Sequence, residues 1–188
     1  MSTLGAILAG GRSSRMGMDK AEVEVDGQTM LQRVASALQA FLPHVVLLGA
    51  DREGMECWPD DLPARGPLGG IASALSRMED DHLLVVAVDQ PFVRTETLAR
   101  LGDLKSEMTV VPVDALGVRQ VTCAVYPKSI AEVAMEEAQA EGSMQSLLDR
   151  VSFQAVTPET WASWGEDGRS WFSVDTPASL EEGIRRFL

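Results

Sequence analysis

The chain has 188 residues, of which 28 are acidic and 16 are basic, so its formal net charge is −12 at pH 7. This charge argues against a nucleic-acid polymer or an anionic membrane as a partner, because like charges repel. Small anions are still compatible with it, because a local group of cations acts over distances at which the remote acidic surface is screened. A hydrophobic fraction of 45% and a charged fraction of 23% are ordinary for a globular protein, and the length suits one domain.

The N-terminal segment and the cysteines both favour a cytoplasmic protein. The N-terminal apolar run has no basic segment before it and breaks at Gly10 and Gly11, which is unlike a secretory signal peptide. The longest apolar runs, such as residues 83–88, are too short to cross a bilayer. Cys57 and Cys123 lack a metal-binding spacing, so buried reduced thiols are favoured over a disulfide.

Short apolar segments alternate with amphipathic segments along the first half of the chain. Strands are predicted over residues 3–8, 44–49 and 83–88, each aliphatic and bounded by Gly, Asp or Pro. Between them, apolar residues recur at helical spacing over residues 30–41 and 68–78. Strands that alternate with helices predict an α/β fold with a single doubly wound, mostly parallel sheet and helices on both faces.

The second half of the chain is predicted to be less regular, and no repeat or linker separates it from the first. Strands are predicted at 108–113, 118–125, 153–156 and 171–174, and helices at 129–140 and 143–150. Thr176 followed by Pro177 predicts the start of a final helix, because threonine caps helix N-termini and proline suits the first helical position.

A glycine-rich segment with three cations follows the first predicted strand. The stretch LAGGRSSRMGMDKA places Arg12, Arg15 and Lys20 after Gly10 and Gly11. Glycines leave backbone N–H groups accessible, and the serine hydroxyls and cations add donors, a mixture that suits phosphate oxygens. The spacing fits neither a P-loop nor GxGxxG, and a plain strand-to-helix turn is the alternative interpretation.

Asp89 directly follows the predicted strand at 83–88. Ligands of open α/β sheets bind outside the carboxyl ends of the strands, so a carboxylate there is suited to holding Mg²⁺ against phosphate oxygens. An Asx-turn before Pro91 is the alternative, and both roles are compatible. Asp175 follows the predicted strand at 171–174 and would share a metal with Asp89 only if the two strands lie close together; otherwise it assists the helix cap.

Several other polar residues have simpler interpretations. Asp60 and Asp61 would accept hydrogen bonds from a base or ribose, or form a solvated turn. The GPLGG segment opens a helix whose N-terminus would steady a nucleotide, although tight packing is the favoured reason for its glycines. His44 and His82 lie at the entrances of predicted strands and are expected at the surface.

The motifs LAGGRSSRMGMDKA, GPLGG, VDQPF and VDTPASL, in this order, resemble those of the molybdenum cofactor guanylyltransferases. The first motif is typical of the wider nucleotidyltransferase group, and the similarity covers nearly the whole chain. It implies a Rossmann-like nucleotidyltransferase fold and Mg²⁺-dependent transfer of GMP from GTP to the phosphate of molybdopterin, with release of pyrophosphate. Residues 1–110 would form the nucleotide-binding half of a single domain, and residues 111–188 the acceptor-side half.

The resemblance also implies roles for individual residues. The implied catalytic residues are Arg15, Lys20 and Asp89, and Asp89 is also the implied metal ligand. The residues implied to bind the nucleotide are Leu8, Ala9, Gly10, Gly11, Lys20, Asp61 and Asp89, with Asp60 as the alternative to Asp61. The implied partners are GTP and molybdopterin, together with cofactor-biosynthesis proteins and apo-molybdoenzymes.

The chain departs from the family pattern at three places. Met18 stands where relatives often have glycine, and Val121 where proline is frequent. The stretch LLGADR lacks an asparagine that contacts the nucleotide in some relatives, so Gly49 or Asp51 would replace it. The alternatives are cytidylyl transfer to the same pterin, another small-molecule nucleotidyltransferase and a non-catalytic nucleotide-binding regulator; relatives of the cytidylyl type tend to read LAAG, whereas Gly10 stands here.

Overall fold

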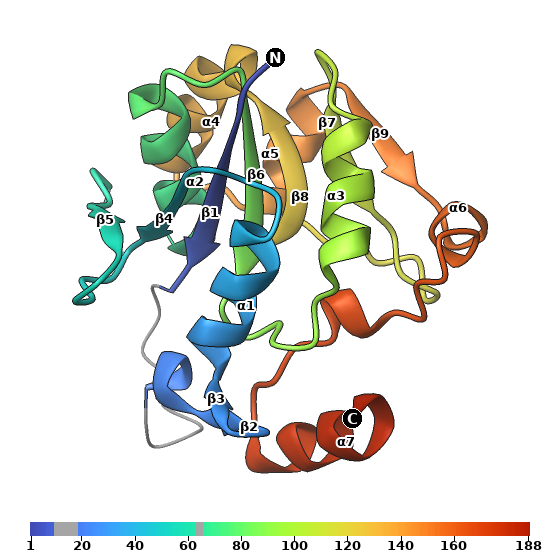
Figure 1. The fold of residues 1–188 in the computed structure, drawn as a ribbon. Coiled ribbons are helices and arrows are strands. Elements are labelled where there is room, and N and C mark those ends of the chain that lie inside the picture. The colour runs from blue at the N-terminus through green and yellow to red at the C-terminus, as the bar shows by residue number, and fades with distance from the viewer. Residues whose placement is uncertain (10–18, 63–65) are drawn as a thin grey trace.

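The computed structural model describes residues 1–9, 19–62 and 66–188, and Figure 1 shows a central sheet with helices on both faces. The sheet strands are β1 (Thr3–Leu8), β4 (Val45–Leu48), β5 (Glu56–Trp58), β6 (His82–Ala87), β7 (Thr109–Pro112), β8 (Cys123–Pro127) and β9 (Phe153–Val156), and β2 (Glu24–Val25) pairs with β3 (Gln28–Thr29) in a separate ribbon.

Seven α-helices and three short 3₁₀ helices connect these strands in the described ranges. The α-helices are α1 (Met30–Gln39), α2 (Gly66–Arg77), α3 (Thr95–Asp103), α4 (Ala131–Gln139), α5 (Met144–Arg150), α6 (Pro158–Ala162) and α7 (Pro177–Phe187), and the 3₁₀ helices are η1 (Lys20–Glu22), η2 (Lys128–Ile130) and η3 (Arg169–Trp171). Among these helices, none combines the length and the apolar character that crossing a bilayer requires.

The strand order β5-β4-β1-β6-β8-β7-β9 confirms the predicted mostly parallel sheet. Strand β8 is antiparallel to both of its neighbours, whereas the other paired strands of this sheet run parallel. The polypeptide reverses between β7 and β8, so this pair is an antiparallel hairpin within an otherwise parallel arrangement.

Alternate residues of β1 pack into two different cores, one on each face of the sheet. Leu4, Ala6 and Leu8 join the core under α2, α4 and α5, whereas Ile7 joins the core under α1 and α3. This is the consequence of the two-residue period of a strand. Because both faces are covered, β1 and β6 are almost continuously apolar, which is why the sequence predicts them well.

The central strands end together and so define one edge of the sheet. Leu8 pairs in register with Leu48 of β4 and with Ala87 of β6. The residues that follow these strands therefore leave the sheet at the same edge, which is at the bottom of Figure 1, where η1 and α7 also lie. A site built from several chain segments is expected at such an edge.

One predicted strand begins too early, and another is absent. Residues 118–122 do not belong to β8, which begins at Cys123; the chain turns before it, and Asp114 accepts hydrogen bonds from the N–H groups of Leu116 and Val118. Residues 171–174 form the end of η3 and an extended segment rather than a strand. Their apolar side chains pack into two cores, which gives the segment the apolar composition of a strand without a strand partner.

The predicted positions of the histidines and cysteines are confirmed only in part. His44 is exposed, as predicted, but the surface position of His82 is wrong: its side chain is buried and its Nε2 lies 2.8 Å from the carbonyl oxygen of Ser106. Cys57 and Cys123 are both free thiols, although only Cys123 is fully buried. Burial raises the pKa of the Cys123 thiol to about 12, so the thiol stays protonated at neutral pH.

Helix α7 packs closely on two aromatic rings through Gly183. A Cβ atom at Gly183 would overlap the Phe92 ring, with Cζ at 2.7 Å, and would lie 3.1 Å from Cε1 of Phe172. Thr176 caps this helix, as predicted, by accepting a hydrogen bond from the N–H of Ser179. The glycine therefore fixes how near α7 lies to Phe92 and with it the position of the residues just before the helix.

Gly183→Ala is expected to destabilise the fold. Overpacking costs about 1–3 kcal/mol, of which the better helix propensity of alanine offsets up to about 1 kcal/mol. The midpoint of thermal unfolding should fall by a few degrees, on the order of 2–4 °C per kcal/mol for a chain of this size.

Gly102→Ala in α3 is the matched control for this substitution. Its Cβ would meet only ordinary contacts, 3.8 Å from Leu84 and 3.9 Å from Phe41. This variant should therefore be as stable as the parent or slightly more stable. Equal unfolding midpoints for the two variants would contradict the close packing of α7.

Candidate active site

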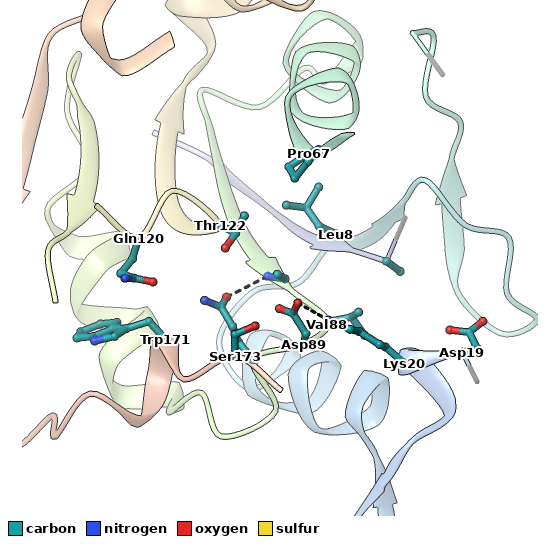
Figure 2. A pocket seen from close by; sticks show the side chains of 13 residues that line it. Leu8, Asp19, Lys20, Pro67, Val88, Asp89, Gln120, Thr122, Trp171 and Ser173 are labelled. Carbon is teal, nitrogen blue, oxygen red and sulfur yellow. Dashed lines mark hydrogen bonds and ion pairs between the residues drawn. The ribbon is translucent and has the colours of Figure 1, made fainter. Parts of the chain in front are cut away.

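The ammonium group of Lys20 lies between two carboxylates that come from distant parts of the chain. Lys20 Nζ is 3.0 Å from Oδ2 of Asp89 and 2.5 Å from Oδ1 of Asp175. Figure 2 shows the first of these contacts just beyond the carboxyl end of β6. Lys20 and Asp89, two of the three implied catalytic residues, therefore lie together.

Lys20 is the first residue of η1, and its neighbours hold that short helix in place. The Asp19 carboxylate caps η1 by accepting a hydrogen bond from the N–H of Ala21 at 3.0 Å. Arg52, from the segment after β4, forms an ion pair with Asp19, and its Nε lies 3.8 Å from Oε1 of Glu22. These contacts fix the backbone from which the Lys20 side chain extends.

One backbone hydrogen bond, between Val174 and Asp89, places Asp175 within reach of Lys20. The N–H of Val174 donates to the carbonyl oxygen of Asp89 at 2.7 Å, which places the segment before α7 beside the end of β6. The backbone N–H of Asp175 also donates to Oγ of Ser179 at 3.0 Å, so the start of α7 holds the aspartate in place. The two aspartates are therefore neighbours, although no strand carries Asp175.

The two ion pairs with Asp89 and Asp175 keep Lys20 charged. Burial alone would lower the pKa of Lys20, but the hydrogen bonds that Lys20 donates to Asp175 and Asp89 and the charges of both carboxylates outweigh burial and raise the pKa above its ordinary value. The side chain of Lys20 is 19% exposed, against 25% for Asp89 and 50% for Asp175. Lys20 is thus a permanent, largely shielded cation at neutral pH.

A cavity of about 300 Å³ opens beside Lys20 and Asp89. Its lining also includes Leu8 and Ala9, which the sequence predicted as nucleotide-binding residues. The lining residues that were not predicted include Gln120, Thr122, Trp171 and Ser173. Figure 2 shows Gln120 and Trp171 on one side of Asp89 and Leu8 on the other. None of these four belongs to a motif that a single sequence would associate with ligand binding.

The other predicted site residues divide into two groups. Gly10, Gly11 and Arg15 lie outside the described residues, so their predicted roles stay predictions. Asp61 forms a bidentate pair with Arg77, whose nitrogen Nη2 is 2.9 Å and 3.1 Å from the two carboxylate oxygens. Asp60 instead receives the N–H of Leu62 at 2.8 Å.

A second cavity, of about 420 Å³, lies at the carboxyl ends of β4 and β5. Its lining includes Gly49 and Asp51, the residues predicted to replace the missing asparagine, and Asp60 rather than Asp61. Trp58 forms another part of the wall, and the guanidinium of Arg77 lies 5.8 Å from its ring centroid. Apolar rings beside carboxylates are suited to a flat base that carries N–H donors.

Asp89 and Asp175 fit the ligand set of a magnesium ion. Mg²⁺ usually takes one or two protein carboxylates and completes its shell with water and substrate phosphate oxygens. No group of three metal-ligating side chains occurs within the ranges that the structure describes, which excludes there a cage made of protein ligands alone. The two carboxylates around Lys20 have the right donor type for an ion that arrives with a phosphate ligand.

Known proteins match both the sequence and the fold. A family model described as "MobA-like NTP transferase domain" matches residues 5–156. A protein from Pelotomaculum thermopropionicum named "Probable molybdenum cofactor guanylyltransferase" is 34% identical over 187 residues, covering 96% of this chain and 91% of the relative.

Two solved structures show how widely the fold is shared. Molybdopterin-guanine dinucleotide biosynthesis protein A from Archaeoglobus fulgidus has a TM-score of 0.83 at 24% identity and covers 97% of both chains. The 2-C-methyl-D-erythritol 4-phosphate cytidylyltransferase from Thermus thermophilus has a TM-score of 0.70 at 16% identity and covers 96% of both chains. The fold alone therefore does not distinguish between bases.

Asp175→Asn is expected to lower the pKa of Lys20. The substitution removes a carboxylate that raises this pKa, whereas the burial that lowers it is unchanged. The measurement is a pH titration of the Lys20 side chain by NMR in metal-free buffer, with Asp103→Asn on the exposed end of α3 as the control. A Lys20 pKa that does not fall in Asp175→Asn would contradict the three-residue arrangement.

Proposed function

The chain belongs to the MobA-like NTP transferase family and, within it, to the molybdenum cofactor guanylyltransferases, and from this premise we propose that it transfers GMP from GTP to molybdopterin. The acceptor is the phosphate group of molybdopterin or the molybdenum cofactor, and the products are the guanine dinucleotide and pyrophosphate. The observation that carries the proposal is the Lys20 ammonium beside Asp89 and Asp175 at the wall of a cavity.

The proposed reaction needs no side-chain base. An oxygen of the acceptor phosphate attacks the α-phosphorus of GTP, a new P–O bond forms, and the bond to the β-phosphate oxygen breaks as pyrophosphate leaves. A phosphate monoester is already an anion near neutral pH, so it attacks without losing a proton to the protein. This agrees with the cavity wall, which contains lysine, aspartate, amide and hydroxyl groups and, among the described residues, no histidine.

The barrier to this reaction is electrostatic, because two anions must approach and charge accumulates on the leaving pyrophosphate. Lys20 is already charged and already held at the cavity, so little reorganisation is needed when a phosphate arrives. Its ammonium would pass from the two carboxylates to the phosphate oxygens. Arg15 is proposed to assist, and the backbone N–H groups of Gly10 and Gly11 are proposed to bind the same phosphates.

Magnesium is the proposed cofactor, with Asp89 as a ligand and Asp175 as a second ligand. The ion would neutralise part of the phosphate charge that the protein cations leave uncompensated. Asp89 is anchored at the end of a buried strand and Asp175 at the start of a capped helix, so both carboxylates are held in place before any ion arrives.

The nucleotide is proposed to occupy the side of the site formed by β1, β4 and β5. Leu8 and Ala9 line the first cavity, and Gly49, Asp51 and Asp60 line the second, where the guanine would lie. Asp61 is still proposed as a nucleotide contact, which would require it to exchange its partner Arg77 for the ligand. In this proposal residues 1–110 bind the nucleotide and residues 111–188 bind the acceptor, within one cytoplasmic domain.

Cytidylyl transfer to the same pterin is the second candidate function. A cytidylyltransferase shares the fold, so the fold is compatible with cytidylyl transfer, whereas the sequence relatives named guanylyltransferase favour GTP. A non-catalytic regulator is disfavoured, because Lys20 and Asp89 are both present and in contact.

Lys20→Ala and Asp89→Ala are each expected to lower the turnover number by on the order of a hundredfold or more, the usual effect of removing a preorganised charge. The assay measures pyrophosphate release from GTP with molybdopterin as the acceptor. Lys128→Ala and Asp103→Ala, which change exposed residues of the same types, should keep the parent rate. Near-normal turnover of the folded Lys20 or Asp89 variant would refute the role assigned to that residue.

GTP with Mg²⁺ is expected to stabilise the protein more than CTP with Mg²⁺. A ligand at a hundred times its dissociation constant adds about 2.7 kcal/mol to the free energy of unfolding, which corresponds here to a rise on the order of 5 °C in the unfolding midpoint. A thermal shift assay with both nucleotides at equal concentration makes the comparison. A larger shift with CTP would favour the cytidylyl alternative.

A further inference from the structure

One side of the cavity presents polar groups that the proposed nucleotide and metal do not use. Gln90, Gln120, Thr122, Trp171 and Ser173 are among the residues that line the cavity. In Figure 2, Gln120 and Trp171 lie on the side of Asp89 away from Leu8 and Lys20. A group attached to the attacking phosphate would reach this wall.

The amide of Gln120 is held in one orientation. Its Nε2 donates to Oδ2 of Asp114 at 3.0 Å and to the carbonyl oxygen of Val118 at 3.3 Å. Both partners only accept hydrogen bonds, so the NH₂ group must face them and the oxygen Oε1 must face away. Within the described part of the chain, no residue donates a hydrogen bond to Oε1. Gln120 therefore offers the cavity a hydrogen-bond acceptor.

The amide of Gln90 is oriented in the opposite sense. The N–H of Ala87 donates to the carbonyl oxygen of Thr122 at 2.9 Å and shares this hydrogen bond with Oε1 of Gln90 at 3.2 Å, so this oxygen faces the backbone and the NH₂ group is the part left for the cavity. The side chain is only 2% exposed, and no acceptor for its Nε2 occurs in the described ranges. Because Gln90 lines the cavity, this NH₂ group is available to donate to a ligand there.

Trp171 gives this wall a rigid aromatic part. Its ring contacts that of Trp161 at 5.3 Å in a T-shaped arrangement. The preceding residue, Ser170, donates through Oγ to the buried Glu166 at 2.5 Å, and Glu166 also accepts from Thr97 of α3. These bonds hold the backbone that carries Trp171. The wall thus combines an aromatic surface with one fixed acceptor and one fixed donor.

We propose that Gln120, Gln90 and Trp171 form the acceptor subsite and recognise the amino-lactam edge of a pterin ring. Such an edge carries N–H donors next to a carbonyl acceptor, so Oε1 of Gln120 would accept from the ring and Nε2 of Gln90 would donate to it. This inference rests on the proposed function. Guanine carries the same edge, so the chemistry of the wall suits both rings. The wall is given to the acceptor because the nucleotide is proposed to lie on the side of Leu8, away from Gln120 and Trp171.

The first test is steady-state kinetics of Gln120→Met, which keeps the side-chain length and removes the acceptor. Losing one hydrogen bond to a bound ring is expected to raise the KM for molybdopterin roughly tenfold. The turnover number and the KM for GTP should stay within about twofold, as for the loss of uniform binding of one substrate. Thr122→Val, which removes a lining hydroxyl with little change of shape, tests the same wall without disturbing the turn around Asp114.

The matched control is Gln139→Met, which changes an exposed glutamine at the end of α4 and should leave every constant unchanged. A tenfold rise in the KM for GTP in Gln120→Met, with the KM for molybdopterin unchanged, would assign the wall to guanine and overturn the inference. Unchanged constants for both substrates in Gln120→Met would overturn it as well.

The second test is equilibrium binding of phosphate-free pterin and guanosine, followed by ligand-observed NMR. Parent protein saturated with GTP should still bind pterin, whereas guanosine should be displaced, and Gln120→Met should bind pterin roughly tenfold more weakly. Displacement of pterin by GTP, or no pterin binding at all, would overturn the inference. Gln120-dependent pterin binding in a protein without transferase turnover would instead support the subsite and refute the proposed function.

Discussion

The contact of one ammonium group with two carboxylates is the constraint around which the site is built. Lys20, Asp89 and Asp175 come from three segments that meet only at the edge where β1 and β6 end. Without the lysine, two aspartates with neighbouring backbones would repel each other, and without the aspartates, burial would disfavour the ammonium. Each charge is therefore tolerated because the other two are present. This mutual dependence explains how a chain with a net charge of −12 keeps a defined cationic group where an anion would bind.

The same arrangement suits a site that exchanges partners during a reaction. Among the described residues, the side chain of Lys20 is bound by two carboxylates. In the proposed reaction, an incoming phosphate with a divalent cation would supply each of these groups with a new partner of opposite charge. Such an exchange would replace charge-assisted contacts with others of the same kind, in a site whose groups are already held in place. The segments that carry Lys20 and Asp175 are both held by neighbouring side chains. Asp19 and Arg52 hold the segment of Lys20, whereas Ser179 holds that of Asp175.

The sequence predicted the elements whose signal is local and missed those that depend on distant contacts. Strands β1 and β6 are buried on both faces and read as apolar runs, so they and the position of Asp89 at the carboxyl end of β6 were predicted correctly. The contact of Asp175 with Lys20 was not predictable, because it depends on one bond between Val174 and Asp89 rather than on a strand. The orientation of Gln120 likewise depends on Asp114 across a turn, and no spacing in the sequence encodes it.

The reversed strand β8 explains how one edge of the sheet supplies both sides of the cavity. Parallel strands bring the residues that follow them to their carboxyl edge, as β1 and β6 do for Ala9 and Asp89. Because β8 runs antiparallel to β6, with Cys123 opposite Val86, it brings to that edge the residues that precede it. The carbonyl oxygen of Thr122 accepts from the N–H of Ala87 at 2.9 Å, which fixes this placement. A further parallel strand would have put Gln120 and Thr122 at the opposite edge, so the wall opposite Leu8 exists because the direction of the chain changes there.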